Sequence, residues 1–286
     1  MDKRTNLTMN KNYVEDFATM LRLQRYAESS IKTYTSHLSY FLKLSAKYDP
    51  EDITQKQLED FVIWLVEKKK VGMSYQKAMI ATIGKFYKET FQRPVNLKHL
   101  YPQRNVVNKL PKFLTKMEVK KILNSISNIK HKAILTTIYS CGLRLGELLE
   151  LKKSDIKTEQ NIVLIRQVKG KKDRVVTLSP KLIELLREYY KIYNPKKYLF
   201  EGSENEKYSQ RSVQQIMKSS LKKSGVASPA SVHTLRHSYA THLLENGVDI
   251  KIIKELLGHN SIKTTEIYIH IMDVIKSRVR SPLDIL

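Results

Sequence analysis

The sequence has few of the features that mark secreted or membrane proteins. Among its 286 residues there is a single cysteine, Cys141, which excludes an intramolecular disulfide and a CxxC metal site and fits a reducing compartment. Every hydrophobic run is shorter than the roughly eighteen residues that a membrane span requires. The first ten residues, MDKRTNLTMN, lack the apolar segment of a secretory signal. We therefore expect a cytoplasmic, nucleoid-associated protein without a membrane partner.

Acidic residues are also scarce. There are 28 Asp and Glu against 51 Lys and Arg, which gives a net charge of +23 and a sequence pI near 9.8. The excess is +6 over residues 1–100 and +17 over residues 101–286. Because both parts are basic, the whole molecule, and not a basic tail, is expected to face a polyanion such as nucleic acid.

The spacing of apolar residues predicts a mainly helical protein with a small β-sheet, of the α+β class. Residues 1–100 are expected to form a bundle of four helices, at 13–26, 30–48, 54–69 and 74–91, with Ser29 or Ser30 and Thr54 as N-caps. Residues 101–113 contain two prolines and little periodicity, and are predicted to be a linker. Residues 114–286 form the second predicted domain.

The second domain begins with a capping box. Thr115 and Glu118 have the spacing of that motif, and the next helix, at about 130–140, is expected to end at Gly142. The β-branched runs NIVLIRQ and DRVVTL predict a hairpin with a basic tip. The predicted helices that follow lie at 180–193, 209–223, 233–246, 249–257 and 261–270.

Four segments of this domain carry a recognisable pattern: CGLRLGELLEL at 141–151, VKGKKDR at 168–174, HTLRHSYATHLL at 233–244 and LLGHNSIKTTEIY at 256–268. In order and spacing they resemble the tyrosine recombinase family of site-specific recombinases, which includes phage integrases and Xer-like enzymes. The resemblance implies that residues 114–286 are the catalytic domain. It also implies that the N-terminal helical bundle is a core-binding domain that contacts DNA.

Some candidate residues follow from chemistry before the resemblance is used. His233 and Arg236 are three residues apart on one predicted helix, so their side chains can converge on one phosphate. Arg144 follows the break at Gly142, a sheltered place for a guanidinium aimed at phosphate oxygens. A zinc site of the HExxH kind would need a carboxylate where Thr234 stands, so no metal and no cofactor is expected.

The resemblance assigns the catalytic roles. It implies that Tyr268 is the nucleophile and that His233 takes or returns the proton of the tyrosine. It also implies that Arg144, Arg236 and His259 act on the phosphate oxygens and that a lysine of the hairpin is the general acid. That lysine is Lys169, with Lys171 as the alternative because Val168 stands where the family often has glycine. Glu147 is interpreted as a structural partner, and His237 and His242 as packing or supporting residues.

These residue types suit phosphoryl transfer. A free tyrosine has a pKa near 10, so about one in a thousand is ionised at pH 7, and cationic neighbours reduce that cost. The resemblance implies a 3′-phosphotyrosyl intermediate that a 5′ hydroxyl reverses without ATP. It further implies a homo-tetramer or mixed tetramer on paired double-stranded DNA sites.

Several alternatives stay open. The recombinase could integrate and excise a mobile element or resolve chromosome dimers in the Xer manner. The apolar residues of 271–286 could pack on a neighbouring protomer or on their own core. The competing functions are a type IB topoisomerase-like relaxing enzyme and a non-catalytic, sequence-specific DNA-binding or architectural protein.

Overall fold

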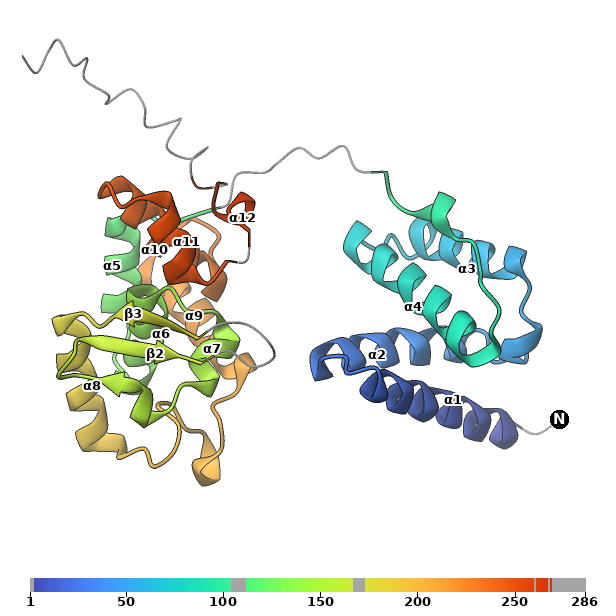
Figure 1. The fold of residues 1–286 in the computed structure, drawn as a ribbon, viewed down its shortest axis with the longest axis horizontal. Helices are drawn as coiled ribbons and strands as arrows, with labels where there is room; N and C mark the ends of the chain where they lie inside the picture. Colours follow the sequence, from blue (N-terminus) through green and yellow to red (C-terminus); the bar gives the residue numbers. More distant parts are fainter. Residues whose placement is uncertain (1–2, 104–111, 167–172, 260, 267, 269–286) are drawn as a thin grey trace, which may run out of the picture. The chain divides into compact units, whose positions relative to one another are not determined.

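The computed structural model describes residues 3–103, 112–166, 173–259, 261–266 and 268, with the backbone alone for 3–12 and 263. It divides into two compact units, Met1–Val107 and Asn108–Leu286 (Figure 1). Each unit has a hydrophobic core of its own. In the described residues no helix is long and apolar enough to cross a membrane.

The first unit is a bundle of helices. They are α1 (Lys3–Leu23), α2 (Glu28–Leu44), α3 (Gln55–Glu67) and α4 (Met73–Phe91), with short 3₁₀ turns at Pro50–Asp52 and Lys98–Leu100. The four predicted helices are confirmed, and Thr54 caps α3 in a capping box. The N-cap of α2 is Ala27, so the prediction of Ser29 or Ser30 was wrong: both serines lie inside the first turn.

The core of the first unit is rich in aromatic rings. Phe17, Phe41, Phe86 and Tyr87 are each at most 2% exposed, and several of them meet edge to face. The hydroxyl of Tyr87 donates to the backbone oxygen of Pro50 at 2.8 Å, so the polar end of this buried ring is satisfied. The bundle therefore has the apolar interior of an independent folding unit.

The second unit combines helices with a small antiparallel sheet. The strands are β1 (Ile156–Lys157), β2 (Ile162–Ile165) and β3 (Arg174–Thr177), in the order β1-β2-β3. The helices are α5 (Lys116–Asn124), α6 (Ile129–Cys141), α7 (Leu145–Glu150), α8 (Pro180–Tyr193), α9 (Gln210–Ser224), α10 (Val232–Glu245), α11 (Ile250–Leu257) and α12 (Lys263–Glu266). The mainly helical fold with a small sheet is confirmed.

The predicted hairpin is confirmed as β2 and β3, with Ile165 opposite Arg174. Strand β1 was not predicted, because two residues are too few to show an alternating pattern. Helix α12 (Lys263–Glu266) falls within the predicted 261–270, of which residues 267, 269 and 270 lie outside the described residues. The tip of the hairpin, with Lys169 and Lys171, and the tail at 271–286 lie outside the described residues.

Helix α6 runs through the interior of the second unit and ends, as predicted, at Gly142. This glycine adopts a φ of +60°, and a Cβ here would lie 2.4 Å from the ring of Tyr239. Glycine is therefore required both by the left-handed backbone and by the close approach of α10. The sharp turn allows α7 to begin within three residues, with Arg144 as its N-cap.

Candidate active site

Arg144 is fixed by a carboxylate in its own helix. Glu147 accepts the backbone N–H of Arg144 at 2.8 Å and its Nη1 at 2.7 Å. The other terminal nitrogen, Nη2, donates to the backbone oxygen of Gly258 at 2.9 Å, which links α7 to the end of α11. About a third of the side chain stays exposed, so this guanidinium remains accessible to an anion.

Glu147 is also held by a second arginine, Arg174 on β3. Arg174 donates from Nη1 and Nη2 to the two carboxylate oxygens at 3.0 and 2.7 Å, and from Nε to the backbone oxygen of Leu256. Burial alone would raise the pKa of Glu147, but the hydrogen bonds and charge of Arg174, with those of Arg144, lower it to about 2. This carboxylate is therefore ionised at neutral pH and orients both guanidinium groups.

Arg236 on α10 is the most deeply buried cation of the cluster. Its side chain is 1% exposed, and it donates to the backbone oxygens of Gly142 at 2.6 Å and Leu257 at 2.7 Å. Glu147 lies 3.7 Å away. Burial and the nearby charge of Arg144 lower the pKa of Arg236 to about 10, which still leaves it charged at pH 7.

Two histidines of α10, His233 and His237, occupy one face of that helix. His233 and His237 are four residues apart, so they are neighbours, and their ring centroids are 4.4 Å apart. His237 Nδ1 is hydrogen-bonded to the hydroxyl of Tyr268 at 2.7 Å. His237, interpreted from the sequence as a packing residue, is therefore the direct partner of the predicted nucleophile.

Tyr268 is almost completely buried. Its exposed fraction is 1%, and its ring packs with Ala240, Ile253 and Leu257. Burial raises its pKa to about 12, while the charges of Arg236 and Arg144 act in the opposite direction. The cations of the cluster thus already act on this hydroxyl, although burial outweighs them here.

His259 follows the end of α11. Its Nδ1 is hydrogen-bonded to Thr265 Oγ1 at 2.9 Å, and its backbone N–H donates to the oxygen of Lys254 at 3.1 Å. Burial, followed by the charges of Arg236 and Arg144, lowers its pKa to about 4. The same causes lower the pKa of His233, although that residue keeps an exposed surface. Both rings are therefore neutral at pH 7 and can donate or accept a proton.

The cluster thus contains five of the six residues selected from the sequence: Arg144, His233, Arg236, His259 and Tyr268. The sixth, Lys169, lies outside the described residues. Within the part of the chain that is described, no three His, Cys, Asp or Glu side chains are arranged to hold a metal ion.

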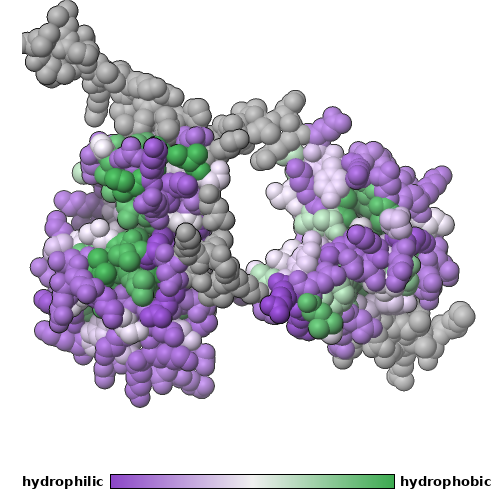
Figure 2. All heavy atoms as spheres, in the orientation of Figure 1, coloured by the Kyte–Doolittle hydropathy of each residue, from purple (hydrophilic) through white to green (hydrophobic). Residues whose placement is uncertain are grey.

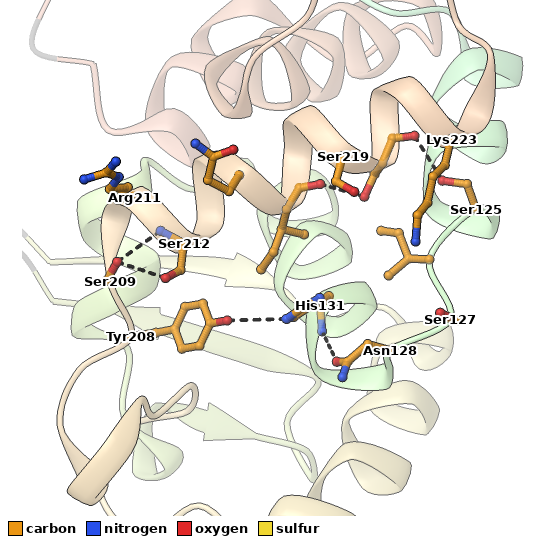
Figure 3. Close-up of a pocket in the computed structure, with 14 residues that line it drawn as sticks. Ser125, Ser127, Asn128, His131, Tyr208, Ser209, Arg211, Ser212, Ser219 and Lys223 are labelled. Atoms are coloured by element: carbon orange, nitrogen blue, oxygen red, sulfur yellow. Dashed lines mark hydrogen bonds between the residues drawn. The ribbon is translucent and has the colours of Figure 1, made fainter.

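A separate polar groove lies elsewhere on the second unit, between α9 and the turn that precedes α6 (Figure 3). It has a volume of about 660 Å³, and its lining includes Asn128, His131, Tyr208, Arg211 and Lys223. None of the five clustered residues lines it. The candidate active site is therefore a set of converging side chains and is distinct from this groove.

Comparison with known proteins identifies the family. The model of the phage integrase family matches residues 112–273, which is more than half of the chain, and a model of the phage integrase N-terminal SAM-like domain matches residues 13–97. The chain belongs to the phage integrase family. It is a tyrosine recombinase, an enzyme that breaks and rejoins DNA in site-specific recombination.

Several relatives match this tyrosine recombinase along most of its length. Tyrosine recombinase XerA of Pyrococcus horikoshii is 35% identical and aligns over 91% of this chain and 89% of its own. A putative integrase/recombinase of Sinorhizobium fredii is 33% identical over 93% of this chain and 86% of its own. The crystal structure of the XerH recombinase in a pre-cleavage complex with difH has the same fold, with a TM-score of 0.72, 22% identity and coverage of 98% and 90%.

Two contributors to the site were missed by sequence reasoning. Arg174 lies in the quoted VKGKKDR segment but was read only as part of a basic hairpin, and its bond to Glu147 spans 27 positions. His237 carried a usable signal, since its spacing of four from His233 places both rings on one face of α10. Its pairing with Tyr268 required knowledge of where Tyr268, which follows α12, packs against α10.

Proposed function

We propose that Tyr268 is the nucleophile of this tyrosine recombinase. Its oxygen attacks the scissile phosphorus, the bond from phosphorus to the 5′ oxygen breaks, and the strand is left joined to the protein as a 3′-phosphotyrosine. The observation that carries the proposal is the place of the Tyr268 hydroxyl in the cluster: it is hydrogen-bonded to His237, which contacts His233 on the same helix as Arg236. A later attack by a 5′ hydroxyl on the phosphotyrosine restores the backbone and returns the proton to the tyrosine.

The remaining residues have complementary roles in this proposal. Arg144 and Arg236 hold the non-bridging oxygens and stabilise the charge that builds up in line between the attacking and leaving groups. His233 moves the proton of the tyrosine, and His259 donates a hydrogen bond to a non-bridging oxygen. Lys169, which lies outside the described residues, protonates the departing 5′ oxygen, with Lys171 as the alternative.

The partner in this proposal is double-stranded DNA, bound by both domains. Support comes from the net charge of +23 and from the largely hydrophilic face that each unit presents in Figure 2. Phosphate contacts make binding strongly salt-dependent. XerH was crystallised on difH DNA, and lambda integrase as a tetramer on a Holliday junction. By analogy, we propose a homo-tetramer or mixed tetramer on paired sites, acting on DNA in the cytoplasm.

The biological reaction is proposed as one of two kinds, integration and excision of a mobile element or Xer-like dimer resolution. The names of the relatives include both integrases and Xer recombinases. Random-site selection with the full chain, followed by a search for the selected sequence, separates them. A single site in the chromosomal terminus supports dimer resolution, and a site at the ends of a mobile element supports integration.

The proposal is tested by covalent trapping on a nicked suicide substrate that carries a selected site. Wild type gives a protein-DNA band on a denaturing gel, and Tyr268→Phe gives none, because the attacking oxygen is absent. Tyr139→Phe is the matched control, since Tyr139 also pairs with a histidine of α10 but lies outside the cluster. A band that persists with Tyr268→Phe assigns the nucleophile elsewhere, and relaxation of supercoiled plasmid without a specific site favours the topoisomerase alternative.

A further inference from the structure

The hydroxyl of Tyr268 is directed at His237 and away from solvent. The hydrogen bond measures 2.7 Å, and the two rings are tilted with centroids 5.7 Å apart. Because only 1% of the tyrosine is exposed, a phosphate on a DNA duplex cannot contact its oxygen in this arrangement. In this structure the Tyr268 hydroxyl is therefore inaccessible to DNA.

The bond between the two residues joins neutral partners. Burial, followed by the charges of His233 and Arg236, lowers the pKa of His237 to about 4. The pKa of Tyr268 is raised to about 12 by burial. At pH 7 the proton therefore stays on the tyrosine, and the bond holds the hydroxyl without activating it.

We propose that His237 is a positioning residue that keeps Tyr268 withdrawn in the DNA-free protein, so that the tyrosine reacts only after it exchanges this bond for the scissile phosphate. The inference rests on the proposed role of Tyr268 as nucleophile. It gives His237 a function separate from that of His233, which keeps an exposed surface one helical turn earlier.

The same helix contains a matched pair outside the site. His242 Nδ1 is hydrogen-bonded to the hydroxyl of Tyr139 at 2.8 Å, with ring centroids 5.8 Å apart. The pair has the same two residue types, the same histidine nitrogen and nearly the same distance as His237 and Tyr268. A change at His242 therefore controls for any general effect of removing a histidine from α10.

The test measures the accessibility of each tyrosine in the DNA-free full-length protein. N-acetylimidazole acetylates accessible tyrosine hydroxyls, and mass spectrometry of peptides gives the rate at each position. We expect His237→Leu to raise the rate at Tyr268 about fivefold, the effect of one net hydrogen bond. His237→Asn, which retains a hydrogen-bonding group near Nδ1, keeps Tyr268 protected, and His242→Leu raises the rate at Tyr139 alone.

Buried Tyr87 and Tyr189 monitor folding, since each is at most 1% exposed. If His237→Leu makes them reactive, His237→Phe fills the same space without a ring nitrogen and repeats the test. The proposal is overturned if Tyr268 stays as protected in a folded variant as in wild type, or if wild-type Tyr268 reacts as fast as exposed Tyr101. The acetylation experiment uses no DNA, so its outcome does not depend on whether Tyr268 is the nucleophile. An error in that assignment is detected separately, by a covalent band in the trapping experiment with Tyr268→Phe.

Discussion

The interiors of the two units differ in charge. In the first unit the buried side chains of the described residues are hydrophobic apart from Thr82. Among the described residues of the second unit four charged side chains are buried, Asp155, Arg174, Glu201 and Arg236, and two of them surround Glu147. The first unit is stabilised by the burial of apolar side chains, as is usual for a small domain. The interior of the second unit also contains charged side chains in fixed positions.

The second unit places its buried arginines, Arg174 and Arg236, around Glu147. Removing a charge from water costs several kcal/mol, and a buried ion pair recovers little more than that cost. The network of Glu147 with Arg144, Arg174 and Arg236 is thus a weak source of stability. In the proposed mechanism its benefit is orientation: Glu147 already holds Arg144, about a third of whose side chain is exposed, in place before a phosphate binds, so little reorganisation of this group is needed. The only tryptophan, Trp64, lies in the first unit, so its fluorescence distinguishes the two units.

The largest expected effect comes from breaking the buried network. Glu147→Ala leaves Arg174 and Arg236 without their carboxylate and should lower the free energy of unfolding of the second unit by about 3 to 5 kcal/mol. Urea titration followed by far-UV circular dichroism measures this loss, while the Trp64 transition stays in place. Glu150→Ala is the control, because its bond to Lys207 is exposed, and it should change stability by less than about 1 kcal/mol. Equal effects of the two variants would contradict the importance of the network.

A substitution in the apolar core of the first unit should destabilise that unit alone. Leu38 has no exposed surface, so Leu38→Ala should cost about 2 to 5 kcal/mol through lost burial and the cavity that remains. The Trp64 fluorescence transition should move to lower urea, with the second-unit transition unchanged. If both transitions move together, the units do not unfold independently.

Acid should weaken the second unit more than the first. Burial lowers the pKa of five described histidines in the second unit, and of His37 in the first; the five are His131, His233, His237, His242 and His259. In the unfolded chain these histidines bind protons near pH 6.5, whereas in the folded protein they do so only at lower pH. The second unit therefore keeps its full free energy of unfolding above pH 6.5 and loses part of it as the pH is lowered toward 4.

A histidine pKa lowered from 6.5 to about 4, as at His237, corresponds to a loss of about 2 to 3 kcal/mol in the free energy of unfolding when the pH falls to 4. Urea titrations at pH 7 and at pH 4 measure the loss, and His237→Asn should reduce it by that amount. An unchanged pH dependence in this variant would show that His237 titrates normally.

The smallest effects are expected at two matched capping boxes. Thr54 caps α3 and Thr115 caps α5, each with its side chain bonded to the backbone of the third residue of the helix. Replacement of either by alanine should cost about 1 kcal/mol. Thr54→Ala should shift the Trp64 transition alone, and Thr115→Ala the other, whereas Thr→Ser at each position should have little effect. A shift of the wrong transition would contradict the assignment of these helices to separate units.

Local sequence signals predicted most of the helices. Capping at Thr54 and Thr115, and the glycine at position 142, act within a few residues, so their signatures can be read without the fold. The start of α1 at Lys3 instead of 13 was missed because its first residues have little apolar periodicity. Strand β1 was missed because it depends on pairing with β2 and not on its own two residues.

Some features of the candidate site could also be predicted from local sequence, and others could not. The proximity of His233 and Arg236 follows from their spacing on one helix, and the resemblance to a family supplied Arg144, His259 and Tyr268. The bonds of Arg174 to Glu147 and of His237 to Tyr268 join elements 27 and 31 positions apart. No local pattern specifies such contacts, since they depend on how helices and strands pack.

The helical class, the excess of positive charge, the membership of a recombinase family and the residues proposed for phosphoryl transfer could all be predicted from the amino-acid sequence. These properties follow from composition, from periodicity and from short motifs, all of which act over a few positions. The sharing of Glu147 between Arg144 and Arg174, and the hydrogen bond of buried Tyr268 to His237, became visible only in the folded protein. Burial and long-range contacts set those relations, because they arise when separate elements exclude water from the same space.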